Sequence, residues 1–171
     1  MGNDLNNKIG IITFHNSYNC GSMLQAFALQ QVVDRLTGKD SEIIDFSNEG
    51  QQKLYSVRQP NDSLKNVIKN IILAPWFKRI ARNYESYERF KKNNFRLSNF
   101  PIHKSADLSD ADYDIVVAGS DQIWNITIAD GDDAYFLPWV KNARKVAYAP
   151  SFGAKNIMDY AANPNRYAEY L

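Results

Sequence analysis

The chain has 171 residues, of which 44% are hydrophobic, and this suits one domain with a substantial buried core. Its net charge of +1 gives no general attraction to nucleic acid, so we expect no nucleic-acid partner. The single cysteine, Cys20, excludes an internal disulfide and fits a reducing compartment. We expect Cys20 to be a small buried residue, and with no signal peptide in view we expect a cytoplasmic protein.

A strand, a helix and a second strand are expected first along the chain. Residues 8–14 are almost continuously apolar and predict a strand that ends in a polar loop, residues 15–22. Apolar residues then recur at helical spacing up to Leu36, and Gly38 follows as a typical helix end. Residues 42–46 predict the second strand, so this part of the chain forms a βαβ unit.

Two further helices are predicted at residues 64–73 and 76–93, separated by Pro75. Residues 65–92 carry eight basic side chains against two acidic ones. The simpler interpretation, which we favour, is a solvated helical face. The alternative is peripheral contact with the inner face of a membrane or with a phosphorylated lipid-linked substrate.

The central strand is expected at residues 115–118, where an apolar run without alternation indicates a strand covered on both faces. Gly119 after it permits a turn or a close approach of the backbone. Residues 145–149 predict a last strand, and the end of residues 156–171 looks helical. Alternating strands and helices predict an α/β fold with a Rossmann-like parallel sheet and flanking helices.

Polar residues follow three of these strands, and the carboxyl ends of parallel strands meet at one edge of a sheet, where ligands bind. We therefore expect one crevice there. The candidate catalytic residues are His15 and Asp121. The candidate substrate-binding residues are Asn16, Asn19, Gly21, Ser22, Gly119, Ser120, Gln122, Asn125 and Ser151.

Each candidate also has a structural alternative. His15 suits a general base or a hydrogen-bonded structural group, and Asp121 suits proton transfer or a helix cap. Asn16 and Asn19 suit sugar hydroxyls, or a turn and a cap. The first loop lacks the glycines of a dinucleotide fingerprint and a Walker lysine, and no metal-ligand spacing is present, so we expect no metal site. The acidic residues 130–133 are expected in a solvated turn.

Three segments together resemble one protein family. Two of them overlap the first and the last predicted strands and continue into the loops that follow, and the most specific part, residues 119–125, follows the central strand. Their sequences are GIITFHN with NCGSMLQA, DYD followed by GSDQIWN, and VAYAPSFG. They are similar to the polysaccharide pyruvyl transferase family. Cys20 departs from the aromatic residue that many relatives have there.

The resemblance implies a two-domain enzyme similar to GT-B glycosyltransferases, with the active site between two Rossmann-like domains. Such enzymes transfer the pyruvyl group of phosphoenolpyruvate to two hydroxyls of a sugar, glycolipid or polysaccharide acceptor as a ketal, with no further cofactor. We expect residues 1–7 to be a polar tail. Residues 8–171 are then an incomplete N-terminal domain with a helical insertion at about 61–97.

The same resemblance implies that the C-terminal domain, which holds phosphoenolpyruvate, is absent. The reaction needs an acid to protonate the enol and cations to hold a phosphate and a carboxylate, but the first two loops contain no lysine or arginine. We therefore expect this chain to supply the sugar side of the cleft and to be inactive alone. The alternative is a non-catalytic sugar- or nucleotide-binding module.

Overall fold

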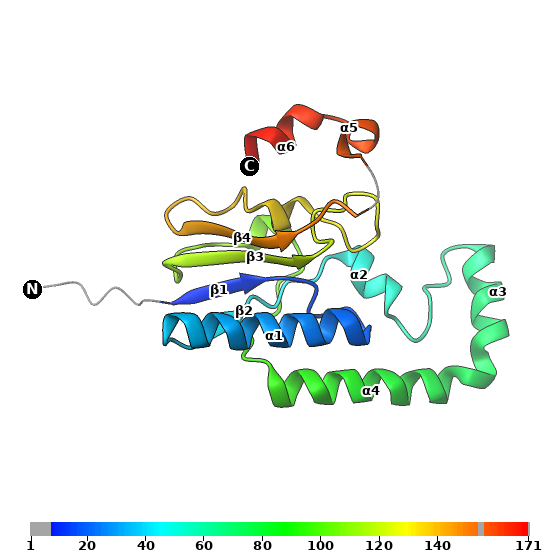
Figure 1. Ribbon diagram of the computed structural model, residues 1–171. Helices are drawn as coiled ribbons and strands as arrows, with labels where there is room; N and C mark the ends of the chain where they lie inside the picture. Colours follow the sequence, from blue (N-terminus) through cyan, green and yellow to red (C-terminus); the bar gives the residue numbers. More distant parts are fainter. Residues whose placement is uncertain (1–7, 154–155, 171) are drawn as a thin grey trace, which may run out of the picture.

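The computed structural model describes residues 8–153 and 156–170. Within them, four parallel strands form one sheet in the order β2-β1-β3-β4 (Figure 1). The strands are β1 (Ile9–Ile12), β2 (Ser41–Ile43), β3 (Ile115–Asp121) and β4 (Arg144–Pro150). The expected α/β fold with a Rossmann-like parallel sheet and flanking helices is confirmed. The predicted polar tail, residues 1–7, lies outside the described residues.

Strand β1 lies at the centre and pairs with β2 on one side and β3 on the other, with Ile9 opposite both Ser41 and Ile115. All four residues of β1 are buried, as their unbroken apolar sequence predicts. Strand β3 continues past the predicted apolar run, and Asp121 still pairs with Pro150 of β4. The polar residues after Ala118 therefore begin inside the sheet.

The helices agree closely with their sequence patterns. Asn19 caps the first helix by accepting a hydrogen bond from the Gly21 amide, and Gly38 ends it in the left-handed conformation, at φ 66°. Short 3₁₀ helices are η1 (Ala74–Trp76), η2 (Ser105–Asp107) and η3 (Asp133–Phe136). The α-helices are α1 (Cys20–Thr37), α2 (Glu49–Leu54), α3 (Leu64–Leu73), α4 (Phe77–Asn94), α5 (Ile157–Tyr160) and α6 (Pro164–Tyr170).

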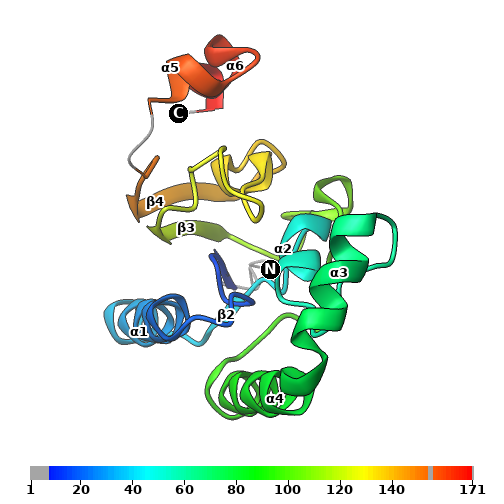
Figure 2. The same cartoon turned by 90° about the vertical axis from the view of Figure 1, so that its right-hand side faces the viewer.

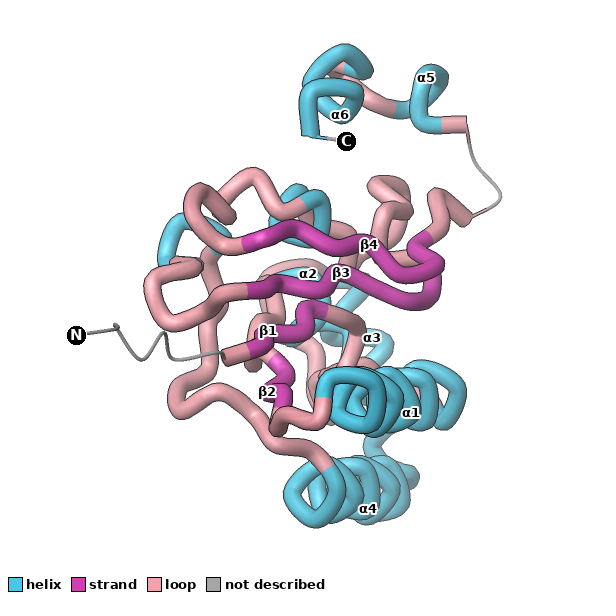
Figure 3. Tube along the Cα trace, turned by 60° about the vertical axis from the view of Figure 1, so that its left-hand side comes forward, coloured by secondary structure: helices cyan, strands magenta, loops and turns pink. Residues whose placement is uncertain are grey.

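The two faces of the sheet are covered differently. Helix α1 packs Met23, Ala26 and Leu29 against one face, with α4 beside α1 (Figure 3). The opposite face is covered by irregular chain between β2 and β4, centred on the fully buried Tyr135. Its ring packs edge-on against Phe14, with the ring centroids 5.0 Å apart. Both faces of β1 and of most of β3 are thus buried, whereas β4 at the edge of the sheet is largely exposed. Polar groups gather at the strand ends.

Two expectations about single residues are wrong. Cys20 is exposed, because it begins α1 at the surface, where its sulfur lies 3.3 Å from the Tyr87 hydroxyl. Asp130 is buried rather than solvated, since the turn that carries it folds back over the sheet edge. There it accepts a hydrogen bond from Ser17 Oγ. Burial raises the pKa of Asp130, and the nearby Asp121 carboxylate adds to the rise.

Candidate functional site

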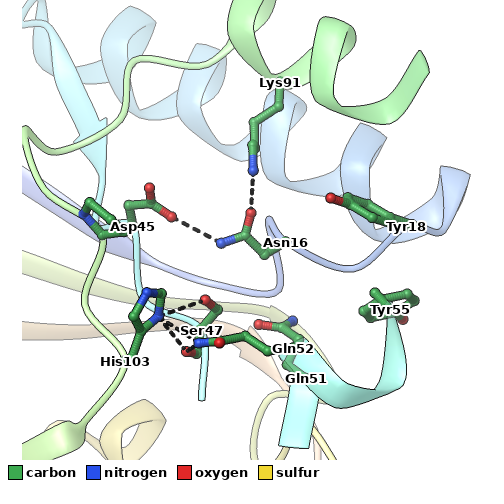
Figure 4. Close-up of a pocket in the computed structure, with 10 residues that line it drawn as sticks. Asn16, Tyr18, Asp45, Ser47, Gln51, Gln52, Tyr55, Lys91 and His103 are labelled. Atoms are coloured by element: carbon green, nitrogen blue, oxygen red, sulfur yellow. Dashed lines mark hydrogen bonds between the residues drawn. The ribbon is translucent and has the colours of Figure 1, made fainter. Parts of the chain in front are cut away.

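A polar pocket of about 370 Å³ lies at the carboxyl ends of β1 and β2 (Figure 4). Its walls come from the loop after β1, the segment after β2, helices α2 and α4, and the chain before η2. Ligands of α/β proteins bind at this edge of the sheet. The lining residues are Asn16, Tyr18, Asp45, Ser47, Gln51, Gln52, Tyr55, Lys91, Pro101 and His103.

Asn16 is held at both ends of its amide (Figure 4). Its Nδ2 donates to Asp45 Oδ1 over 2.9 Å, and its Oδ1 accepts from Lys91 Nζ over 2.6 Å. Lys91 also forms an ion pair with Glu88, with 2.8 Å between Nζ and Oε1. The pocket therefore contains a fixed amide between a carboxylate and an ammonium group, and both charged groups strengthen the hydrogen bonds that fix it.

His15 lies behind Asp45 and does not line the pocket. It is fully buried, with Nε2 3.0 Å from Asp45 Oδ1 and Nδ1 3.2 Å from the Thr13 carbonyl oxygen. Burial alone would raise the pKa of Asp45. Hydrogen bonds from His15 and Asn16, together with the charges of His15 and Lys91, outweigh burial, so the pKa of Asp45 lies below its usual value. The geometry matches the structural alternative for His15, in which it holds Asp45 as a carboxylate.

Tyrosine rings form another part of the pocket wall. The ring centroids of Tyr18 and Tyr55 lie 5.4 Å apart, and Tyr18 also packs against Tyr84 and Tyr87. Tyr18 donates its hydroxyl hydrogen to Glu88 over 2.6 Å. Burial, followed by Glu88, raises the pKa of Tyr18, so its hydroxyl stays protonated. Aromatic faces beside fixed polar groups suit a ligand with an apolar ring face and several hydroxyls.

His103, to which the sequence assigned no role, is the histidine that lines this pocket. Its Nδ1 lies 2.6 Å from Gln52 Nε2 and 3.1 Å from the Ser47 carbonyl oxygen. The segment that carries it is joined to the chain just after β2 by a bridge between Phe46 and Ile102. That bridge brings an imidazole to the pocket from a part of the chain more than fifty residues beyond β2.

Ser22 and Asp121, both predicted site residues, meet between β1 and β3. Ser22 Oγ donates to Asp121 Oδ2 over 3.1 Å. The strand order changes direction at this point of the sheet, which is where ligands bind in doubly wound folds. Gln51 Nε2 donates to Ser17 Oγ over 3.0 Å, and Ser17 Oγ donates to Asp130. Because Gln51 also lines the pocket, these contacts connect the pocket to Asp130, whose pKa the Asp121 carboxylate helps to raise.

The other predicted residues hold local structure. Asn125 Nδ2 donates to Gln122 Oε1 over 2.8 Å, and its Oδ1 accepts from the Thr127 amide. The Ser151 amide donates to the Asp121 carbonyl, and Gly119 and Ser120 lie within β3. Asp121 does not begin a helix, so the capping alternative for it is wrong. Asn16 alone among the predicted residues belongs to the described pocket lining.

Sequence reasoning missed most of the pocket. Asp45 and Ser47 directly follow the predicted second strand, and this position was a usable signal. Lys91 carried none, since it appeared only as one of several basic residues on a helix. The first two loops contain no lysine or arginine, and Lys91 of α4 supplies a cation to this edge of the sheet. Among the described residues, no three acidic, histidine or cysteine side chains gather into a possible metal site.

The fold and pocket define an α/β protein with a pocket of polar residues at the carboxyl edge of a Rossmann-like parallel sheet. The family model described as Polysaccharide pyruvyl transferase matches residues 19–166, nearly the whole chain. The chain belongs to the polysaccharide pyruvyl transferase family, which makes it a transferase family member with a polysaccharide acceptor and a pyruvyl donor. Searches of curated proteins and of solved structures found no match.

Proposed function

We propose that this chain holds the sugar acceptor while the pyruvyl group of phosphoenolpyruvate is transferred to two of its hydroxyls as a ketal. The product is a pyruvylated exopolysaccharide, capsule or other cell-surface glycan. One observation carries the proposal: the Asn16 amide, fixed between Asp45 and Lys91, shares a pocket with the tyrosine rings. The lone cysteine supports a reducing, cytoplasmic setting.

The pocket offers what a sugar acceptor needs. An apolar face of a pyranose ring packs against Tyr18 and Tyr55, while the Asp45 carboxylate accepts a hydrogen bond from a hydroxyl. In the reaction, C2 of the enol gains two C–O bonds to the sugar and loses its bond to phosphate. One hydroxyl proton balances the proton gained at C3, and the other leaves with phosphate. His103, which lines the pocket, is the candidate group for these proton transfers.

The donor places a different demand on the protein. Phosphoenolpyruvate carries a phosphate and a carboxylate, whereas the pocket contains one lysine that already donates to Asn16 and pairs with Glu88. We therefore propose that further cations come from a second, C-terminal domain, as in a GT-B-like pair. The isolated chain then binds phosphoenolpyruvate weakly and does not turn over.

A non-catalytic sugar- or nucleotide-binding module is the second candidate. It is favoured by the balance of lining charges, because Asp45 and Lys91 offset each other and leave little net attraction for a doubly anionic donor. Both candidates share the sugar pocket and differ in chemistry. They are separated by whether a longer chain that includes the second domain forms a pyruvyl ketal.

The acceptor pocket is tested by titrating candidate sugars and sugar nucleotides into the chain and following binding by NMR. Lys91→Met should weaken binding by about tenfold, which corresponds to about 1.4 kcal/mol. Lys92→Met is the matched control, since Lys92 is the next residue of α4 but is exposed. Equal binding by the two variants and by Tyr55→Ala would exclude this pocket as the acceptor site.

The donor side is tested by mass spectrometry of the acceptor after incubation with phosphoenolpyruvate. The chain of 171 residues should leave the acceptor mass unchanged. A pyruvylated product formed by this chain alone would contradict the division of labour between two domains. Such a product would not contradict the assignment of the pocket to the sugar acceptor.

A further inference from the structure

Helix α3 carries an apolar stripe that no other part of the described chain covers. None of its residues is buried, and Leu64, Ile71 and Ile72 are 76%, 68% and 61% exposed. Together with Ile68 they follow the i, i+4, i+7, i+8 spacing of one helix face. The exposed Trp76 of η1 follows directly. The helix stands at the end of the molecule toward which the strands point (Figure 1) and lies at one side when the sheet is viewed from that end (Figure 2).

The polar side of α3, not the apolar side, contacts the loop that precedes the helix. Asn70 Nδ2 donates to the Gln59 carbonyl over 2.8 Å and to Asn61 Oδ1 over 3.0 Å. Asn66 Nδ2 donates to Asp62 Oδ1 over 2.8 Å. This arrangement is the reverse of an ordinary surface helix, whose apolar face turns inward. These hydrogen bonds, on the side of α3 opposite the stripe, leave the apolar residues facing solvent.

The surroundings of the stripe are positively charged. Residues 63–84 contain five basic side chains and no acidic one. Lys65 and Lys69 are exposed on α3 next to the stripe, and Arg79 and Arg82 of α4 share a surface hollow with Trp76. Among the described residues none of these four cations forms a salt bridge. Their charge is therefore available to an anionic partner.

We propose that α3, η1 and the first turns of α4 dock onto the surface of an anionic lipid bilayer. The apolar stripe enters the boundary between headgroups and acyl chains, Trp76 lies at the interface, and the basic side chains bind lipid phosphates. A second copy of this chain fits the surface poorly, because pairing two such faces brings like charges together. Within the described residues no helix is long and apolar enough to cross a membrane.

Helix α4 connects this docking surface to the pocket. Arg79 and Arg82 lie in its first half, and Lys91 lies near its end. Twelve residues of α-helix separate Arg79 from Lys91, a distance of about 18 Å along the axis. Provided that the proposed function is correct, docking holds the acceptor pocket within reach of a sugar attached to a lipid. The docking itself does not depend on that function.

Vesicle sedimentation with the chain of 171 residues tests the proposal. Vesicles of phosphatidylcholine mixed with phosphatidylglycerol should pull down the chain, those of phosphatidylcholine alone should not, and raised salt should release it. Lys65→Glu with Lys69→Glu should weaken binding roughly 30-fold, taking about 1 kcal/mol per basic residue. Lys39→Glu with Lys104→Glu is the control of equal charge, placed at exposed positions elsewhere.

The apolar part is tested by Ile71→Asp, which changes a side chain without buried contacts and should leave the melting curve unchanged. It should abolish sedimentation with anionic vesicles. The proposal is overturned if the Lys65→Glu/Lys69→Glu variant and its control bind the anionic vesicles equally. It is also overturned if binding does not depend on phosphatidylglycerol. The chain could instead bind no vesicles and form a stable dimer that Ile71→Asp dissociates. That result would assign the stripe to contact with a second copy and would also overturn the membrane proposal.

Discussion

The carboxyl edge of the sheet has two halves that use polar residues in opposite ways. On the β1/β2 side, Asn16, Asp45 and Lys91 point into an open pocket and hold one another in place. On the β3/β4 side, Gln122 and Asn125 hydrogen-bond within their own loop. The polar residues of the first half line a pocket that is open to a ligand, and those of the second half stabilise the edge of the sheet.

This difference shows that the most distinctive part of a sequence need not touch the ligand. Residues 119–125 carry the strongest resemblance to the family, yet none of them lines the described pocket. Their contribution is the placement of Asp121 beside Ser22 and of Trp124 over the core, where its Nε1 donates to the Tyr135 carbonyl. Substitutions in the β3/β4 half should therefore change stability, while those in the β1/β2 half should change binding.

The largest expected effect is that of Gly119→Ala. Gly119 has φ 144°, and a Cβ there would lie 2.0 Å from the Tyr148 carbonyl oxygen of β4. Strain and overpacking together should lower the free energy of unfolding by about 3–5 kcal/mol in urea denaturation. Gly38→Ala is the control, because φ is 66° there and a Cβ meets no atom within 4 Å, so that about 1–2 kcal/mol is expected. If both variants lose the same free energy of unfolding, the positive φ alone explains why position 119 needs glycine, and the close approach to Tyr148 adds nothing.

A second stability effect depends on pH. Backbone amides of Ala143, Asn142 and Lys141 donate to Asp110 and lower its pKa to about 2, although burial opposes this. An unfolded aspartate has a pKa of about 3.9, so the contribution is present above about pH 4 and is lost as the pH falls toward 2. Asp110→Ala should lower the free energy of unfolding by about 2 kcal/mol at pH 7. Thermal melts of the unaltered chain and of Asp110→Ala measure this effect. The same difference in melting temperature at pH 7 and at pH 2 would contradict the prediction.

On the pocket side, Asp45→Asn should act on binding. The amide cannot accept from His15, Asn16 and a sugar hydroxyl as a carboxylate does, so acceptor affinity should fall about tenfold in an NMR titration. Asp107→Asn, in the exposed η2 turn, is the matched control. Unchanged affinity in Asp45→Asn would remove the distinction between the two halves of the edge.

The smallest expected effect belongs to the contact between the halves. Ser22→Ala removes the hydrogen bond to Asp121 and should lower the free energy of unfolding by about 1 kcal/mol, with acceptor affinity unchanged. Calorimetry and the same titration measure the two quantities. A marked loss of affinity would show that the acceptor also reaches the β1/β3 position, and would extend the site beyond the pocket described above.

The sequence by itself determined the elements and their class. Unbroken apolar runs identified the buried strands β1 and β3, the sequence before Pro75 placed α3 at residues 64–73 as observed, and Gly38 marked the end of α1. These features are local, because they depend on side-chain periodicity and on backbone conformation within a few residues. For the same reason the sequence correctly indicated a polar edge at the strand ends, including Asn16.

Only the tertiary structure decided which of the polar residues share a pocket. Lys91 reaches Asn16 across 75 positions of the chain, and His103 arrives through the bridge beside β2. Burial reversed the expectation for Asp130, and it favours the structural alternative for His15, which lies behind Asp45. Such placements depend on how helices and loops pack over the sheet. No local pattern encodes them, because the contacts join segments that are distant in sequence.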